Sequence, residues 1–166
     1  MNDFYINLSQ QLNSLDDVSN FMKSTLLQSS ARNQYLGTIS AIDTGAVNSE
    51  IQIRISEQQQ IIAIVTEQSR QERRLAVDIP VIAMIKASSV TLAVGEGLQV
   101  SARNVLRGVV SKLEGGAVNT DVSVALAGGK TLSAMITNRS ADQMMLAEGM
   151  EISALFKASS VILIRA

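Results

Sequence analysis

The sequence IKASSVTLA at residues 85–93 recurs in similar form as FKASSVILI at residues 156–164. In both places an apolar run typical of a buried strand precedes the shared KASSV. The two copies of KASSV are 157 − 86 = 71 positions apart, and the motif SARN, at Ser30 and Ser101, gives the same offset, 101 − 30 = 71. This common spacing indicates that the chain contains one unit twice.

A shift by this offset aligns residues 30–94 with residues 101–165 without a gap. The motif GAVN and a T-x-x-S pair recur at the same spacing, and most apolar positions stay apolar, as at Ile51 and Val122. Four motifs at one offset exclude a chance recurrence. We therefore infer a tandem duplication.

The pattern within each unit predicts β structure. Apolar and polar residues alternate in EIQIRI (50–55) and DVSVAL (121–126), as in strands with one buried face. Gly128 and Gly129, between two such stretches, predict a hairpin. The first unit has SEQQQII (56–62) at this place, so we expect its turn to be longer or differently built.

One short helix or turn is expected in each unit, within SRQERRLAVD (69–78) and SADQMMLAEG (140–149). Ser140 is a candidate N-cap, and Gly149 is a candidate end of the second helix. The expected fold is mainly β, with two tandem five-stranded small barrels that each carry a short helix.

A different pattern precedes the first unit. Apolar residues spaced by three or four positions predict an amphipathic helix that packs on a module or on a partner subunit; they are Leu8, Leu12, Leu15, Val18, Met22 and Leu26. The expected organisation is an N-terminal helix (1–29), a first module (30–94), a linker (95–100) and a second module (101–166).

Composition limits the possible functions. Hydrophobic residues make up 46% of the 166 positions, enough for a buried core. The 14 Lys and Arg against 15 Asp and Glu give no broad positive field to attract nucleic acid or an anionic membrane. The N-terminus does not resemble a signal peptide, and no apolar run reaches the ~18 residues of a membrane span. We expect a soluble, cytoplasmic protein.

Cysteine and histidine are both absent, which excludes disulfides and removes the usual ligands of zinc, copper and haem. We expect no free metal cation. An enzyme is disfavoured, because no Lys or carboxylate base recurs beside a repeated Ser. Single-stranded nucleic acid is also disfavoured, since stacking surfaces need aromatic residues and the chain has no Trp, three Phe and two Tyr.

The polar residues that recur offer hydroxyl groups, one guanidinium, one ammonium and backbone N–H groups, and no carboxylate is kept among them. Lys86 and Lys157 follow apolar runs, which predicts partial burial and the need for a compensating anion. A small oxyanion would suit such a set of donors. Two plainer interpretations stay open: cations at strand ends are often solvated, and Ser-Thr pairs often cap helices or turns.

Taken in order, SARN, GAVN, T-x-x-S and KASSV resemble the Mop, or molbindin, family of molybdate- and tungstate-binding modules. The resemblance covers residues 30–94 and 101–165. It implies a small β-barrel of the OB type. It also implies that the oxyanion lies between modules of different subunits, with SARN and the Lys-Ala step on one side and T-x-x-S on the other.

Carried over by position, the resemblance implies one oxyanion site for each module and a second type of site at the GAVN turns, near a symmetry axis. The first set is Ser30, Arg32, Thr66, Ser69, Lys86, Ala87 and Ser88; the second is Ser101, Arg103, Thr137, Ser140, Lys157, Ala158 and Ser159; the GAVN set is Ala46, Val47, Asn48, Ala117, Val118 and Asn119.

The function that the resemblance implies is binding of molybdate or tungstate for intracellular storage, buffering or homeostasis. The alternative is the ligand-sensing portion of a molybdate-responsive transcription regulator without its DNA-binding domain, because residues 26–41 resemble the start of that portion. A transport ATPase is disfavoured, since no GxxxxGK[ST] phosphate loop is present. We expect a homo-oligomer, with a trimer favoured because both copies keep every motif and a dimer as the alternative.

Overall fold

The computed structural model describes residues 29–166. The predicted amphipathic helix, with its stripe from Leu8 to Leu26, lies outside these residues. The first repeat forms five strands and two short helical turns: β1 (Asn33–Thr44), β2 (Asn48–Arg54), β3 (Gln60–Thr66), α3 (Glu67–Glu72), β4 (Pro80–Ile85), η1 (Ala87–Ser89) and β5 (Thr91–Ala93).

The second repeat follows the same order, with one further 3₁₀ turn in its hairpin. Its elements are β6 (Asn104–Gly115), β7 (Asn119–Leu126), η2 (Ala127–Gly129), β8 (Thr131–Thr137), α4 (Asn138–Gln143), β9 (Glu151–Phe156), η3 (Ala158–Ser160) and β10 (Ile162–Arg165). The prediction of a mainly β chain with two five-stranded sheets and one short helix in each unit is confirmed.

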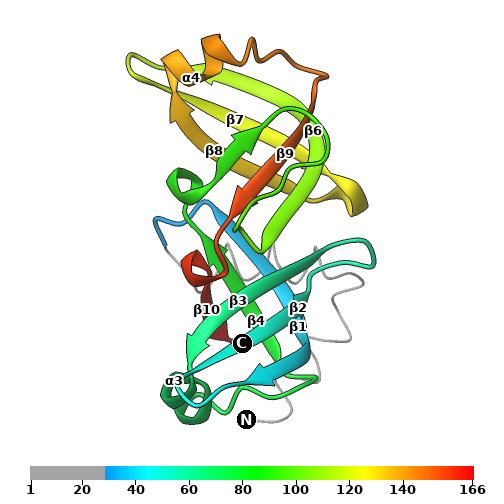
Figure 1. Cartoon of the computed structure of the whole chain (residues 1–166), viewed down its shortest axis with the longest axis vertical. Helices are drawn as coiled ribbons and strands as arrows, with labels where there is room; N and C mark the ends of the chain where they lie inside the picture. Colours follow the sequence, from blue (N-terminus) through cyan, green and yellow to red (C-terminus); the bar gives the residue numbers. More distant parts are fainter. Residues whose placement is uncertain (1–28) are drawn as a thin grey trace, which may run out of the picture.

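The two repeats exchange their last strands. The sheet orders are β10-β4-β1-β2-β3 and β5-β9-β6-β7-β8, so each sheet takes four strands from one repeat and its fifth from the other. Figure 1 shows the red β10 beside the lower sheet and the green strand β5 beside the upper one. Neither repeat therefore supplies a complete sheet by itself.

The KASSV motif makes the crossing from one sheet to the other. Its Ala-Ser-Ser forms a 3₁₀ turn directly after β4 or β9, the second strand from the edge of its sheet. The Ala at the start of each turn and the Val after it are buried, at 5% and 3% exposure for Ala87 and Val90 and at 2% and 4% for Ala158 and Val161. Anchored at both ends, the turn directs the next strand toward the other sheet.

Each sheet bends at a β-bulge, and the two bulges lie at equivalent positions of the two repeats. The pairing of β1 with β2 shifts between Ile39 and Ala41, and that of β6 with β7 shifts 71 positions later. Such bulges bend a strand and increase its twist. Gly37 allows a close approach of β1 to β2, because a Cβ there would lie 2.7 Å from the carbonyl oxygen of Arg54.

The hairpins after β2 and β7 have the same length but are built differently. In the second repeat Gly128 and Gly129 have φ of 81° and 78°, which glycine adopts easily. In the first repeat the Ser56 hydroxyl accepts hydrogen bonds from the N–H groups of Gln58 and Gln59. The prediction of a hairpin at the Gly pair is confirmed.

One apolar core runs through both sheets. It contains residues of both repeats, among them Ile53, Val124 and Phe156, which are 0%, 0% and 2% exposed. Tyr35 also belongs to this core; its hydroxyl donates to the carbonyl oxygen of Thr131 in the other repeat at 2.8 Å, and burial raises its pKa. The two repeats thus share a core as well as strands. Within residues 29–166 no helix has the length and apolar character that crossing a membrane requires.

Candidate functional site

The two SARN motifs lie where the sheets meet, and their asparagines bind the other repeat. The Asn33 side chain donates to the carbonyl oxygen of Ser133 at 2.8 Å and accepts from its N–H at 2.7 Å. Asn104 makes the same pair of bonds with Ile62, both at 2.8 Å. Both asparagines are 2% exposed. Each therefore satisfies backbone groups of β8 or β3, the outermost strands of the sheets.

The arginines of SARN also reach across to the other repeat. Arg32 Nη2 lies 2.9 Å from Asp121 Oδ1, and Arg103 Nη2 lies 2.6 Å from Glu50 Oε1. Hydrogen bonds from these guanidinium groups lower the pKa of both carboxyl groups. The two acids occupy equivalent positions, 121 − 50 = 71, so a carboxylate recurs beside the identical residues although its residue type differs.

The strand register brings the Lys of KASSV beside the Arg of SARN. Asn33 pairs with Ile85 at the end of the β1–β4 ladder, so the next residues on each strand are Arg32 and Lys86. The second repeat has the same arrangement. Lys86 and Lys157 are both exposed, so the predicted partial burial is wrong for this chain. The carbonyl oxygen of each Lys accepts the hydrogen bond that closes the following 3₁₀ turn.

A cavity of about 350 Å³ opens at this junction in the second repeat. Lys157, Ser101 and Ser160 line it from the second repeat, while Ser89 and Thr91 line it from the first. Five of the lining residues thus carry an ammonium or a hydroxyl group, and none of the described lining residues is acidic. This arrangement can hold a small anion through hydrogen bonds and charge.

The GAVN turns and the T-x-x-S pairs lie together at the far end of each sheet. Asn48 pairs with Thr66 across β2 and β3, and the carbonyl oxygen of Val47 accepts from the N–H of Glu67 at 2.8 Å. The second repeat repeats both contacts. Val47 and Val118 at the turn tips are 72% and 69% exposed.

The T-x-x-S pairs cap the short helices. Thr66 Oγ1 accepts from the N–H of Ser69 at 3.1 Å, and Thr137 Oγ1 accepts from the N–H of Ser140 at the same distance. The N-cap of α4 is therefore Thr137, not Ser140, and α4 ends at Gln143, well before Gly149. The prediction of these two caps is wrong because the helix begins earlier than the sequence pattern suggested.

Glu67, the first residue of α3, ties that helix to β2. Its carboxylate accepts hydrogen bonds from Arg70, the Ser49 hydroxyl and Gln71, and these bonds, led by that from Arg70, lower its pKa to about 2. In the second repeat a Thr120 hydroxyl bonded to Asn138 takes this place at 2.8 Å. The same anchor is thus charged in one module and neutral in the other.

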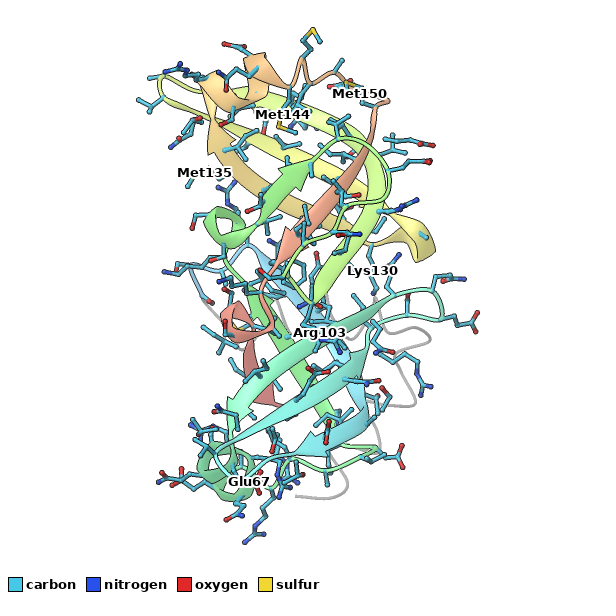
Figure 2. All side chains as sticks on the ribbon, viewed as in Figure 1. Glu67, Arg103, Lys130, Met135, Met144 and Met150 are labelled. Atoms are coloured by element: carbon cyan, nitrogen blue, oxygen red, sulfur yellow. The ribbon has the colours of Figure 1, made fainter. Side chains whose placement is uncertain are left out.

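Within one chain, the predicted site residues fall into two separate groups. Among residues 29–166, no hydrogen bond joins the SARN and KASSV side chains to the T-x-x-S pairs. Figure 2 shows Arg103 near the middle of the molecule, whereas Glu67, which follows Thr66, lies at one end. The fold therefore brings SARN and KASSV together, and GAVN and T-x-x-S together, but not the two groups with each other.

Sequence reasoning missed several residues of the junction. The cavity is lined by Ser89 and Ser160, the second serines of KASSV, and not by Ser88 or Ser159. The motif contains both serines, and only the geometry of the 3₁₀ turn decides between them. The acids at positions 50 and 121 recur in charge but not in identity, which is a usable signal. Within the described part of the chain, no group of three or more acidic residues is placed to hold a metal ion.

Comparison with known proteins agrees with this architecture. The TOBE domain family matches residues 29–92 and 100–163, which include both repeats up to their last strands. The chain belongs to this family, as a tandem of two domains.

Two relatives of this chain have names that refer to molybdenum. The chain is 38% identical over 151 residues to the molybdenum transport protein ModE of Herbaspirillum seropedicae, covering 90% of this chain and 56% of that one. It is 40% identical over 145 residues to the molybdenum-pterin-binding protein MopA of Rhodobacter capsulatus, covering 87% and 55%. The chain thus spans little more than half the length of these relatives.

A solved structure gives an end-to-end match. The cytoplasmic molybdate-binding protein ModG, crystallised with molybdate bound, is 40% identical to this chain and superposes with a TM-score of 0.81. The match covers 84% of this chain and 100% of ModG. The match therefore includes the whole of ModG and leaves 16% of this chain, 100 − 84, outside it.

Proposed function

We propose that this chain binds molybdate or tungstate and serves their intracellular storage, buffering or homeostasis. The observation that carries the proposal is the cavity at the junction, which is lined by Lys157, by three serines of SARN and KASSV, and by Thr91. A tetrahedral oxyanion accepts hydrogen bonds in every direction, which suits such a set of donors. The match to ModG over its whole length supports the same ligand.

The proposed site keeps the residues assigned from the sequence, with additions from the structure. SARN and KASSV supply one wall through Ser30, Arg32, Lys86, Ala87 and Ser88, and through their equivalents Ser101, Arg103, Lys157, Ala158 and Ser159. Ser89, Thr91 and Ser160 are added to the set that contains Lys157. The other wall, Thr66 with Ser69 and Thr137 with Ser140, comes from a neighbouring subunit. The GAVN turns form the second type of site.

The role proposed here is binding, not catalysis, with no nucleic-acid or membrane contact by this chain. A cytoplasmic location is proposed because ModG is described as cytoplasmic. A second candidate function is the ligand-sensing part of a transcription regulator. The regulator ModE of Yersinia pestis favours it, being 34% identical over 138 residues that make up 52% of its length.

Arg32→Ala and Arg103→Ala should each remove one class of site. A charge-assisted partner of a bound anion contributes about 1.5–3 kcal/mol, so we expect affinity at the altered site to fall roughly tenfold to a hundredfold. Calorimetric titration with molybdate measures both affinity and the number of sites. Full stoichiometry and affinity in the double variant would show that the site is assigned to the wrong residues.

The matched controls are Asp121→Asn and Glu50→Gln, which break the same ion pairs but keep both guanidinium groups. Because these changes remove negative charge beside the proposed site, binding should be retained or strengthened. Weaker binding in the controls, equal to that of the Arg variants, would mean that the ion pair matters and not the guanidinium.

The assembly proposed is a homo-oligomer, with a trimer favoured and a dimer as the alternative. The two groups of site residues lie apart in one chain, and the exposed Val47 and Val118 beside T-x-x-S offer apolar contacts to a neighbour. A ligand that bridges subunits stabilises the oligomer by mass action, so molybdate should raise the Tm as its concentration rises. Light scattering and thermal scans test this; a monomer with full affinity would contradict it.

A further inference from the structure

The edge strand β5 brings a hydroxyl group close to the lysine of the second KASSV motif. Thr91, the first residue of β5, pairs with Leu155 of β9, which lies two residues before Lys157. All three residues line the junction cavity of about 350 Å³. Thr91 is exposed, and within residues 29–166 its hydroxyl has no hydrogen-bond partner. This hydroxyl is therefore available to donate to an anion that the lysine attracts.

The equivalent residue of the other edge strand is apolar. Ile162, the first residue of β10, pairs with Met84 of β4, which lies two residues before Lys86. It corresponds to Thr91, since 91 + 71 = 162. Ile162 is 57% exposed, so its hydrocarbon side chain lies at the surface beside β4. The first junction thus has an exposed apolar group where the second has a hydrogen-bond donor.

The other lining positions differ less between the two junctions. The three serines of the second junction each have a serine 71 positions away, and its Lys and its apolar residues also recur in kind. The further exchange is Ser29 in the place of Val100, since 100 − 71 = 29. The Ser29 hydroxyl accepts from the N–H of Ala31 at 3.1 Å and is therefore engaged within its own turn. The clearest difference in available donors lies at the first residue of the exchanged strand.

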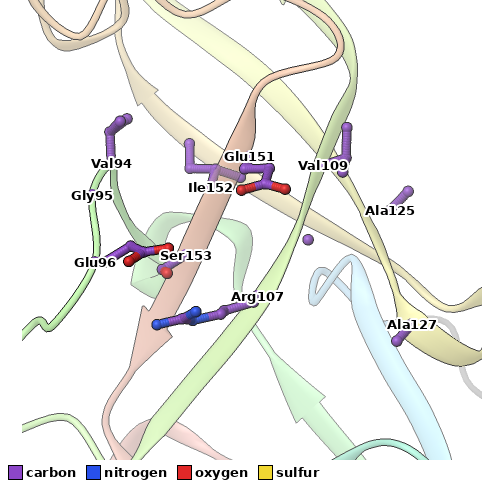
Figure 3. A pocket seen from close by; sticks show the side chains of 11 residues that line it. Val94, Gly95, Glu96, Arg107, Val109, Ala125, Ala127, Glu151, Ile152 and Ser153 are labelled. Carbon is purple, nitrogen blue, oxygen red and sulfur yellow. The ribbon is translucent and has the colours of Figure 1, made fainter.

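A larger cavity, of about 500 Å³, is lined by residues of β6 and β9 and by the segment that follows β5. Figure 3 shows Arg107 together with Glu96 and Glu151 around it. A dianion bound there would be attracted by one guanidinium and repelled by two carboxylates. This cavity is therefore less suited to an oxyanion than the junction, and Arg107 provides a control cation outside the proposed site.

We propose that the two oxyanion sites of one chain differ in affinity, and that Thr91 makes the site at the second junction the tighter one. This inference rests on the proposed binding of molybdate or tungstate. A hydrogen bond to a charged group contributes enough to change affinity about tenfold or more, and Ile162 offers no such donor at the first junction. Two sites of unequal affinity fill over a wider range of ligand concentration than two equal sites, which suits a buffering role.

Calorimetric titration of the full chain with molybdate tests the proposal through two single changes. Thr91→Val removes the hydroxyl and should weaken the tighter site about tenfold or more, whereas Ile162→Thr adds a hydroxyl and should strengthen the weaker site. Both changes keep a β-branched residue on its strand, so the fold should be retained. In the Arg103→Ala background, which removes the site at the second junction, Thr91→Val should have no further effect.

Ile162→Val and Arg107→Gln are the controls. The first shortens an apolar side chain without adding a donor, and the second removes a cation that lies outside the junction; both should change affinity much less than Thr91→Val. Equal affinities in the unaltered chain, unchanged affinity in Thr91→Val or Ile162→Thr, or the same effect of Ile162→Val and Ile162→Thr would overturn this inference and leave the proposed function standing. No binding of molybdate by the unaltered chain would overturn both.

Discussion

Replacing Leu163 by Ala, in the last strand of the second repeat, should open the first sheet and not the second. Leu163 is 8% exposed in the main core and pairs with Ala83 of β4. Removing a buried Leu side chain costs about 2–5 kcal/mol of unfolding free energy. Urea unfolding measures this loss. Hydrogen exchange in mild denaturant should show the loss of protection in β4.

The chain provides a matched control at the equivalent position, since 92 + 71 = 163. Leu92 is 7% exposed and pairs with Ala154, so Leu92→Ala should remove protection from β9 although it alters the first repeat. Each variant is thus expected to lose protection in the sheet formed mainly by the other repeat. If each variant instead loosens the sheet that holds the other strands of its own repeat, the strand exchange is not the structure in solution.

The second large effect is expected from Asn104→Ala. This change removes two hydrogen bonds of 2.8 Å and leaves the N–H and carbonyl groups of buried Ile62 without their partner. Because unsatisfied buried polar groups are costly, we expect a loss of about 2–4 kcal/mol. Asn33→Ala should act in the same direction through Ser133.

Asn48→Ala and Asn119→Ala provide the comparison, because both side chains are exposed at the GAVN turns. They should change the free energy of unfolding by less than about 0.5 kcal/mol. Equal, small effects for all four variants would mean that the asparagines of SARN do not hold the two repeats together.

Much of the fold could be predicted because strands with one buried face show alternating apolar and polar residues, as in residues 50–55. The duplication also presents each such pattern twice. The strand exchange could not be predicted in this way. The alternation of Leu163 and its neighbours is the same whichever sheet they join. The direction in which the chain leaves the KASSV turn decides the partner, and this depends on the packing of Val90 and Val161.

The residues of the candidate site are assigned from recurring motifs, whereas their contacts could not be predicted from the sequence. Two of the repeated positions, Arg32 and Arg103, could be found from identity alone, whereas their partners Asp121 and Glu50 differ in residue type. The asparagines of SARN stood within a recognised motif, yet nothing in the sequence shows that a side chain pairs with a distant strand. Such contacts depend on how the two sheets dock.

Calorimetric titration of the full chain with molybdate, tungstate, sulfate and phosphate, run in parallel, tests the proposed function most directly. The donors at the junction, including Lys157 and Ser101, should bind molybdate and tungstate tightly and sulfate and phosphate weakly. Sulfate or phosphate binding as tightly as molybdate, or no binding of molybdate at all, would contradict the account.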